Sequence, residues 1–252
     1  MTRMPQFILD LKSKQNKFVW SNDLHHKFTD VLLVNDRLFE VVSKIGYKAA
    51  VGIAVALTEL IQETVKDRYP YIDVTQEFGP KIEALWAGAV DPLYLRNFGF
   101  EYKYYDENGG STPYGSNWGV LFFVAKEYIE GSFYIHQYLV NLSMLARHLI
   151  SNKKLFDIWF TETIRKTAEV FPCPYDYDDL DMYDDEAKYD CSADAPVPQE
   201  FFFDPEFKYS EDAAKPVLNA FLHSLDYNNN PWLRTPEEML AKGFNGTPYK
   251  VL

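Results

Sequence analysis

Apolar residues recur at helical spacing through most of the chain, from about residue 22 to residue 171. Steps of three and four between them are typical of helices that bury one face. The segment over 47–67 contains the most apolar run of the chain, 49–57, and is predicted to be a buried, central helix. Small residues around Gly52 should let a neighbouring helix approach it closely. The series before this helix, which ends near Gly46, consists of Leu24, Phe28, Val31, Leu38, Val42 and Ile45.

Four further helices are predicted before residue 172. Pro80 suits the first turn of one helix, and Asp91-Pro92 should end it. Another covers 118–130, and the last runs over 153–171. Between these two, a regular apolar stripe predicts a helix that buries Ile135, Leu139, Leu142, Ala146 and Leu149.

The remaining stretches combine turn-forming residues with short helices. Residues 97–117 form either a long loop or a small hairpin that turns at Asn108-Gly109. A helix is expected over 213–225, with Pro216 in its first turn. The final helix has Thr235 as N-cap and Gly243 as its stop.

These patterns predict an all-α fold: a single-domain multi-helix bundle over 1–252. Its helical core covers about 20–171. An irregular segment over about 172–210 is rich in acidic and aromatic residues. The C-terminal helices lie within about 211–252.

Composition restricts the class of partner. The 252 residues are 47% hydrophobic and 17% aromatic, which is enough to bury a large core. The formal net charge of −12 repels nucleic acid and anionic membrane surfaces and favours a basic protein partner. The sequence does not indicate the oligomeric state.

No targeting or membrane segment is expected. Near the start, only residues 7–9 are consecutively apolar, too few for a signal peptide. The apolar run over 49–57 is far shorter than the about 20 residues of a membrane-spanning helix. Cys173 and Cys191 are expected to remain thiols, so we expect a cytoplasmic protein.

The sequence carries no catalytic signature. His25 and His26 are adjacent, and His136 and His148 lie twelve residues apart, about 120° around a helix. Metal-binding, nucleophile and phosphate-loop motifs are missing, and the acidic run does not match a calcium loop. We therefore predict no catalytic residue, no metal ligand, no cofactor and no enzymatic activity. The alternative is a hydrolase that combines His136 or His148 with carboxylates from other helices.

The strongest local feature is an acidic stretch over 176–190. It holds eight acidic residues against one lysine, which accounts for −7 of the net charge. Tyrosines at 175, 177, 183 and 189 are interleaved with the acids and favour a protein interface. A solvated linker is the alternative, because charge runs commonly are linkers. The residues predicted to bind a partner are Tyr177, Asp178, Asp179, Asp181, Tyr183, Asp184 and Asp185.

The chain also resembles a family of binding proteins. The stretches that carry the resemblance are 86–92 (WAGAVDP), 142–148 (LSMLARH) and 230–240 (NPWLRTPEEML). Together with the acidic, aromatic-rich helical character, they resemble immunity proteins encoded beside polymorphic or type VI-secreted toxins. This resemblance implies a bacterial inhibitor that binds a toxin and occludes its active site. It assigns no functional residue.

The expected function is therefore that of a cytoplasmic immunity protein, or antitoxin, for a basic toxin or effector domain such as a nuclease. Besides the hydrolase, a regulatory or scaffold subunit is a further alternative. In that case the acidic stretch would serve only as a linker.

Overall fold

The computed structural model describes residues 18–30, 35–69, 73–97, 111–175 and 188–251. These residues form helices and no strand, and two isolated bridges, Ile45 with Pro172 and Leu95 with Leu233, are the extended pairings within them. The predicted all-α class is confirmed. Three short 3-10 helices cover Lys66–Arg68, Pro92–Tyr94 and Cys191–Ala193.

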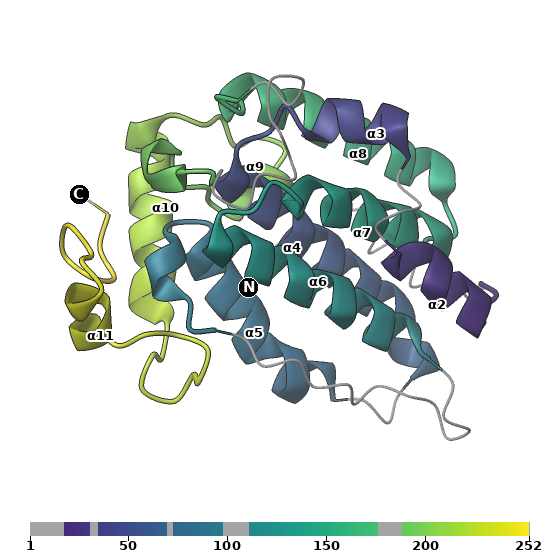
Figure 1. The fold of residues 1–252 in the computed structure, drawn as a ribbon, viewed down its shortest axis with the longest axis horizontal. Helices are drawn as coiled ribbons and strands as arrows, with labels where there is room; N and C mark the ends of the chain where they lie inside the picture. Colours follow the sequence, from purple (N-terminus) through teal and green to yellow (C-terminus); the bar gives the residue numbers. More distant parts are fainter. Residues whose placement is uncertain (1–17, 31–34, 70–72, 98–110, 176–187, 252) are drawn as a thin grey trace.

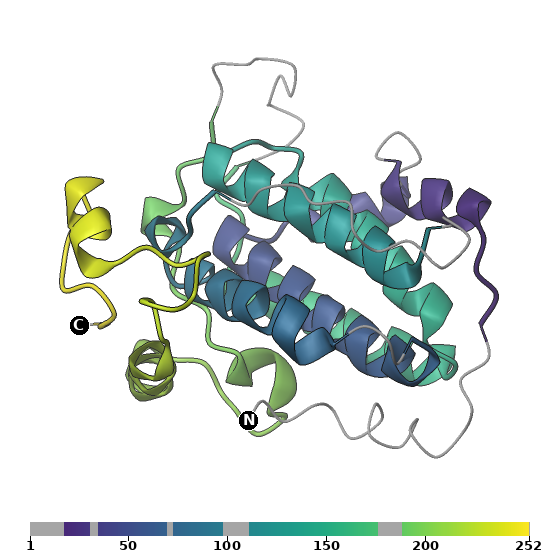
Figure 2. The ribbon, with the colours of Figure 1, turned by 90° about the horizontal axis from the view of Figure 1, so that it is seen from below.

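Helix α4 (Tyr47–Val65) is the centre of the fold, as its sequence predicts. It packs against α5 (Val74–Gly88), α6 (Pro113–Glu130) and α7 (Ile135–Leu149). These four helices lie side by side in Figures 1 and 2. Burial of most of its residues explains why α4 is largely apolar.

Shorter helices and α8 cover one side of this central group. Helix α2 (Asn22–Thr29) packs on α6 and α7. Helix α3 (Asp36–Val42) lies against α7 and α8 (Lys153–Val170), which also contacts α7 (Figure 1). The series before Gly46 therefore forms two helices, because Ser21 and Asn35 each cap a new helix with a side-chain oxygen.

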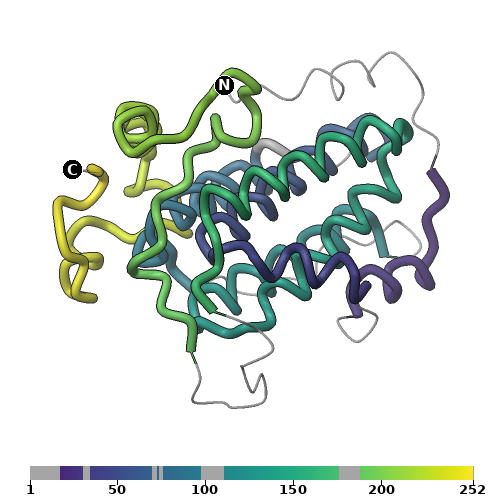
Figure 3. The backbone as a smooth tube through the Cα atoms, turned by 90° about the horizontal axis from the view of Figure 1, so that it is seen from above, coloured from purple at the N-terminus to yellow at the C-terminus, as the bar shows by residue number. Residues whose placement is uncertain are grey.

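The C-terminal part lies at one end of the bundle. Helix α9 (Glu200–Phe203) packs on α4, and α10 (Glu211–Ser224) and α11 (Pro236–Ala241) follow beyond the ends of the long helices (Figure 3). The close approach expected at Gly52 comes from α9: a Cβ there would lie 2.7 Å from Phe202 Cε2.

Pro80 and Pro216 were predicted in the first turns of their helices. Both predictions were wrong, because the helices begin earlier. Asp73 caps α5 by accepting from the Gln76 backbone N–H, which leaves Pro80 inside the helix. Ser210 caps α10 in the same way, so Pro216 is also internal. Helix α6 begins at Pro113, inside the stretch predicted as irregular, because Thr112 caps it. The hairpin turn at Asn108-Gly109, one of the two alternatives for this stretch, lies outside the described residues.

Other local predictions are confirmed. The five apolar residues of the α7 stripe are fully buried. Helix α11 has Thr235 as N-cap with a complete capping box to Glu238, and Gly243 follows it at a φ of 86°. Within the described ranges, no helix is long and apolar enough to cross a membrane.

Candidate functional site

The seven residues predicted to bind a partner, from Tyr177 to Asp185, lie within 176–187 and so outside the described residues. What the structure describes is the base from which this stretch leaves and to which it returns. We call Tyr175 and Tyr189, with the residues they contact, the base of the acidic segment.

Aromatic rings build this base. The Tyr189 ring stacks on Tyr47, the first residue of α4, with ring centroids 3.6 Å apart and planes 10° from parallel. The Tyr175 ring lies 4.9 Å from Tyr189 and 5.6 Å from Phe133. The two ends of the acidic stretch are therefore held beside each other on the helical core.

Polar contacts fix Tyr189 further. Its hydroxyl donates to the Asp194 carboxylate at 2.9 Å, and its backbone N–H donates to the Gly131 carbonyl at 2.8 Å. Lys48 Nζ donates to the Asp194 backbone carbonyl at 2.7 Å. Burial raises the pKa of Asp194, although the hydrogen bond from Tyr189 opposes that shift.

Gly131 is required for this geometry. Its φ of 71° is left-handed, and a Cβ at this position would lie 2.9 Å from the Tyr189 carbonyl oxygen. The end of α6 therefore makes direct backbone contact with the returning end of the acidic stretch.

The interpretation of the outer tyrosines as contact residues needs correction. Tyr189 is buried, and Tyr175 is partly buried against the core. Both rings pack inward, Tyr189 on Tyr47 and Tyr175 against Phe133. The sequence held one signal of this: Ala187 and Lys188 separate Tyr189 from the densest run of acids.

Both cysteines are free thiols. Cys191 is buried, and burial raises its pKa to about 11. Burial also raises the pKa of Cys173. Neither thiol is activated as a nucleophile, since activation requires a lowered pKa.

The two histidines considered for a hydrolase, and His25 as well, form hydrogen bonds to other segments of the fold. His136 is fully buried, its Nε2–H donates to the Ile45 carbonyl at 2.7 Å, and burial lowers its pKa to about 4. His148 Nε2–H donates to the Val19 carbonyl at 2.8 Å. His25 Nδ1 shares a hydrogen bond of 2.7 Å with Ser116 Oγ. Each of these rings therefore links two segments of the fold.

Metal-ligating residues do not gather in the described ranges, where no group of three or more His, Cys, Asp or Glu side chains could hold an ion. Glu59 is an ionisable residue that sequence reasoning missed. It lies on α4, accepts from Trp86 Nε1 at 2.8 Å, and burial raises its pKa to about 7. An acidic residue two positions after the apolar run 49–57 was the available signal.

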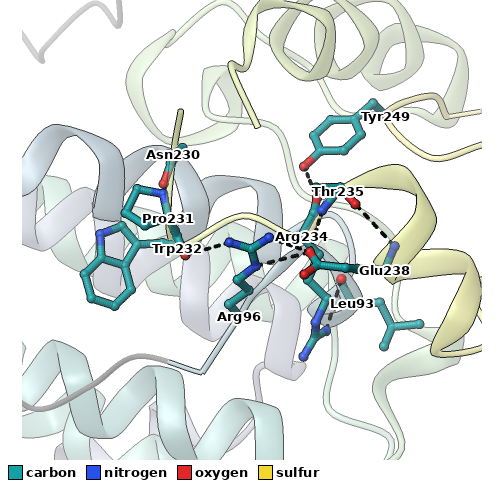
Figure 4. Close-up of polar contacts among 9 residues, drawn as sticks. All are labelled: Leu93, Arg96, Asn230, Pro231, Trp232, Arg234, Thr235, Glu238 and Tyr249. Atoms are coloured by element: carbon teal, nitrogen blue, oxygen red, sulfur yellow. Dashed lines mark hydrogen bonds and ion pairs between the residues drawn. The ribbon is translucent and has the colours of Figure 1, made fainter. Parts of the chain in front are cut away.

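The stretch 230–240, which contributed to the resemblance, connects the C-terminal part to the bundle (Figure 4). Arg96 binds the Glu238 carboxylate at 2.6 Å, and the Arg96 backbone N–H donates to the Trp232 carbonyl. The Arg234 guanidinium donates to the Leu93 carbonyl at 3.1 Å, and Tyr249 donates to the Arg234 carbonyl at 2.6 Å. The polar residues of the stretch 230–240 are therefore explained by their contacts with the bundle and with the end of the chain.

Comparison of the chain with protein-family models, curated protein sequences and solved structures found no significant match.

Proposed function

We propose that this chain is an immunity-type binding protein, which uses the acidic, tyrosine-bearing stretch 176–187 to capture a basic effector domain and block its active site. The observation that carries the proposal is the base of the acidic segment. Tyr175 and Tyr189 hold the two ends of a strongly negative stretch beside each other on the helical core.

Two physical arguments support this function. Clustered carboxylates raise the association rate with a basic partner, and the effect is strongest at low salt. Anchored ends reduce the conformational freedom that the stretch would lose on binding. An effector that acts on a polyanion, such as a nuclease, has a basic active site to which these carboxylates are complementary.

The test begins with capture of partners from the native host by the tagged chain at low and high salt. The captured protein is then measured against two matched variants. One replaces Asp179, Asp181 and Asp185 with Asn. The other replaces three exposed acids outside the stretch, Glu40, Glu83 and Glu206, with Gln, which removes the same charge.

The variant of the acidic stretch should associate about tenfold more slowly at low salt, with a flatter salt dependence and unchanged helicity. The control variant should associate within about twofold of the parent. In cells, the captured effector should be toxic alone and harmless with the parent chain. Equal association rates for the two variants would contradict the proposal.

A further inference from the structure

A groove of about 590 Å³ is lined by residues of helices α2, α3, α7 and α8, near the C-terminal end of α7. The base of the acidic segment lies near the opposite end of α7. It includes Tyr47 and Phe133, and Phe133 lies two residues before the start of α7. Three phenylalanines from α2 and α8 line the groove: Phe28, Phe156 and Phe160. Met144 from α7 and the exposed Val41 from α3 extend this apolar surface.

The charges around the groove are opposite in sign to those of the chain. Its lining holds four lysine and arginine residues and one carboxylate, Asp157, whereas the whole sequence has 25 basic and 37 acidic residues. The basic residues come from every wall: Lys27 from α2, Arg37 from α3, Arg147 from α7 and Lys153 from α8.

The single acid is already neutralised. Asp157 accepts from Arg147 Nε at 2.7 Å and from Arg147 Nη2 at 2.9 Å. Lys27, Arg37 and Lys153 form no ion pair with a described residue. Lys153 also begins α8, whose N-terminal end contributes positive potential. The groove therefore combines an apolar floor with uncompensated positive charge.

We propose that this groove binds a single-chain anionic amphiphile, a fatty-acid-like carboxylate. Its hydrocarbon chain would lie on Phe28, Phe156 and Phe160, and its carboxylate would lie between Arg37 and Lys153. The basic residues would favour an anionic head group, and the apolar floor would favour a hydrocarbon chain.

The size of the groove argues against larger occupants. Its volume is in the range of small-molecule sites, about 300–1,000 Å³. A stable protein contact needs about 800 Å² on each partner, and a helix with its side chains is about 10 Å wide. Residues 1–17 carry four basic residues and one acid, so their charge opposes docking in this groove.

Binding is tested with dodecanoate, dodecanol and dodecyltrimethylammonium, each below its micelle-forming concentration, by calorimetric titration of the full chain. Dodecanoate should bind one to one, and both other probes should bind at least about tenfold more weakly. Arg37→Gln combined with Lys153→Gln should weaken dodecanoate binding by roughly tenfold. Adding Val41→Glu to this double variant should weaken dodecanoate binding further, because the new carboxylate would lie at the apolar surface.

The matched control is Lys215→Gln combined with Lys242→Gln, which removes the same charge from exposed positions in the C-terminal part. It should bind dodecanoate within about twofold of the parent. Failure of the full chain to bind dodecanoate would overturn the proposal. So would equal binding of the cationic probe, or equal weakening by the groove and control variants.

Discussion

Polar side chains buried in the helical core have structural roles that their residue types alone do not reveal. His136, a candidate for catalysis from the sequence, is sealed inside the bundle and joins α7 to the Ile45 carbonyl. Lys48, in the first turn of the most apolar helix, reaches the Asp194 carbonyl. In each case the partner is distant in sequence, so the pattern around the residue could not predict the contact.

His136 predicts a specific pH dependence of stability. Its pKa is about 4 in the folded chain and about 6.5 when unfolded, so the unfolded state binds more protons between these values. The free energy of unfolding should therefore fall by up to about 3 kcal/mol through this window as pH decreases. His136→Gln retains a donor for the Ile45 carbonyl and should lack this loss, so its stability deficit at pH 7 should shrink towards pH 4.

Urea unfolding monitored by circular dichroism from pH 4 to pH 8 measures the effect. Glu59 has the opposite influence, because its raised pKa makes the folded state bind more protons between pH 4.5 and about 7. The difference between variant and parent profiles isolates His136, since both chains contain Glu59. Parallel profiles would show that His136 is protonated equally in both states.

At the scale of elements, helix starts were harder to predict than helix faces. The apolar periodicity of α7 correctly indicated which side is buried. Pro80 and Pro216 led to wrong helix starts, because proline is common in the first turn of a helix. The residues that cap these helices, Asp73 and Ser210, lie further upstream. Close packing likewise depends on what approaches a helix, as at Gly52.

Two glycine substitutions test this packing. Gly52→Ala should lower the free energy of unfolding by about 1–2 kcal/mol, because the clash with the Phe202 ring outweighs the better helix propensity of alanine. Gly119→Ala is the matched control in the middle of α6, where a Cβ meets nothing within 4 Å. It should raise stability by about 0.5–1 kcal/mol. Thermal or urea denaturation of both variants checks the signs, and stabilisation by Gly52→Ala would contradict the packing.

At the scale of the whole molecule, docking of the C-terminal part depends on few residues. Tyr249 is buried, its ring lies 5.0 Å from Tyr94 and 4.6 Å from Tyr227, and its hydroxyl binds the Arg234 carbonyl. The backbone of Arg234 in turn donates to the Tyr94 carbonyl. Tyr249 therefore connects the last residues of the chain to the segment that follows α5.

Tyr249→Ala should release this part locally. Amide hydrogen exchange over 227–251 should become about 100-fold faster, while exchange in α4 and α7 stays near the parent value. Lys250→Ala changes the neighbouring exposed residue and should leave exchange unchanged. Equal acceleration across the whole chain would show that the C-terminal part unfolds only together with the bundle.

The sequence by itself determined the helical class, the central position of α4, the buried faces and the capped helix α11. These depend on local periodicity and capping, which act over a few residues. It also located the acidic stretch, whose role as a binding segment stays a prediction. Only the tertiary structure decided that Tyr189 stacks on Tyr47 and meets Tyr175, and that basic residues of four helices surround one apolar groove. Such arrangements arise from contacts between residues far apart in the chain, which no local pattern records.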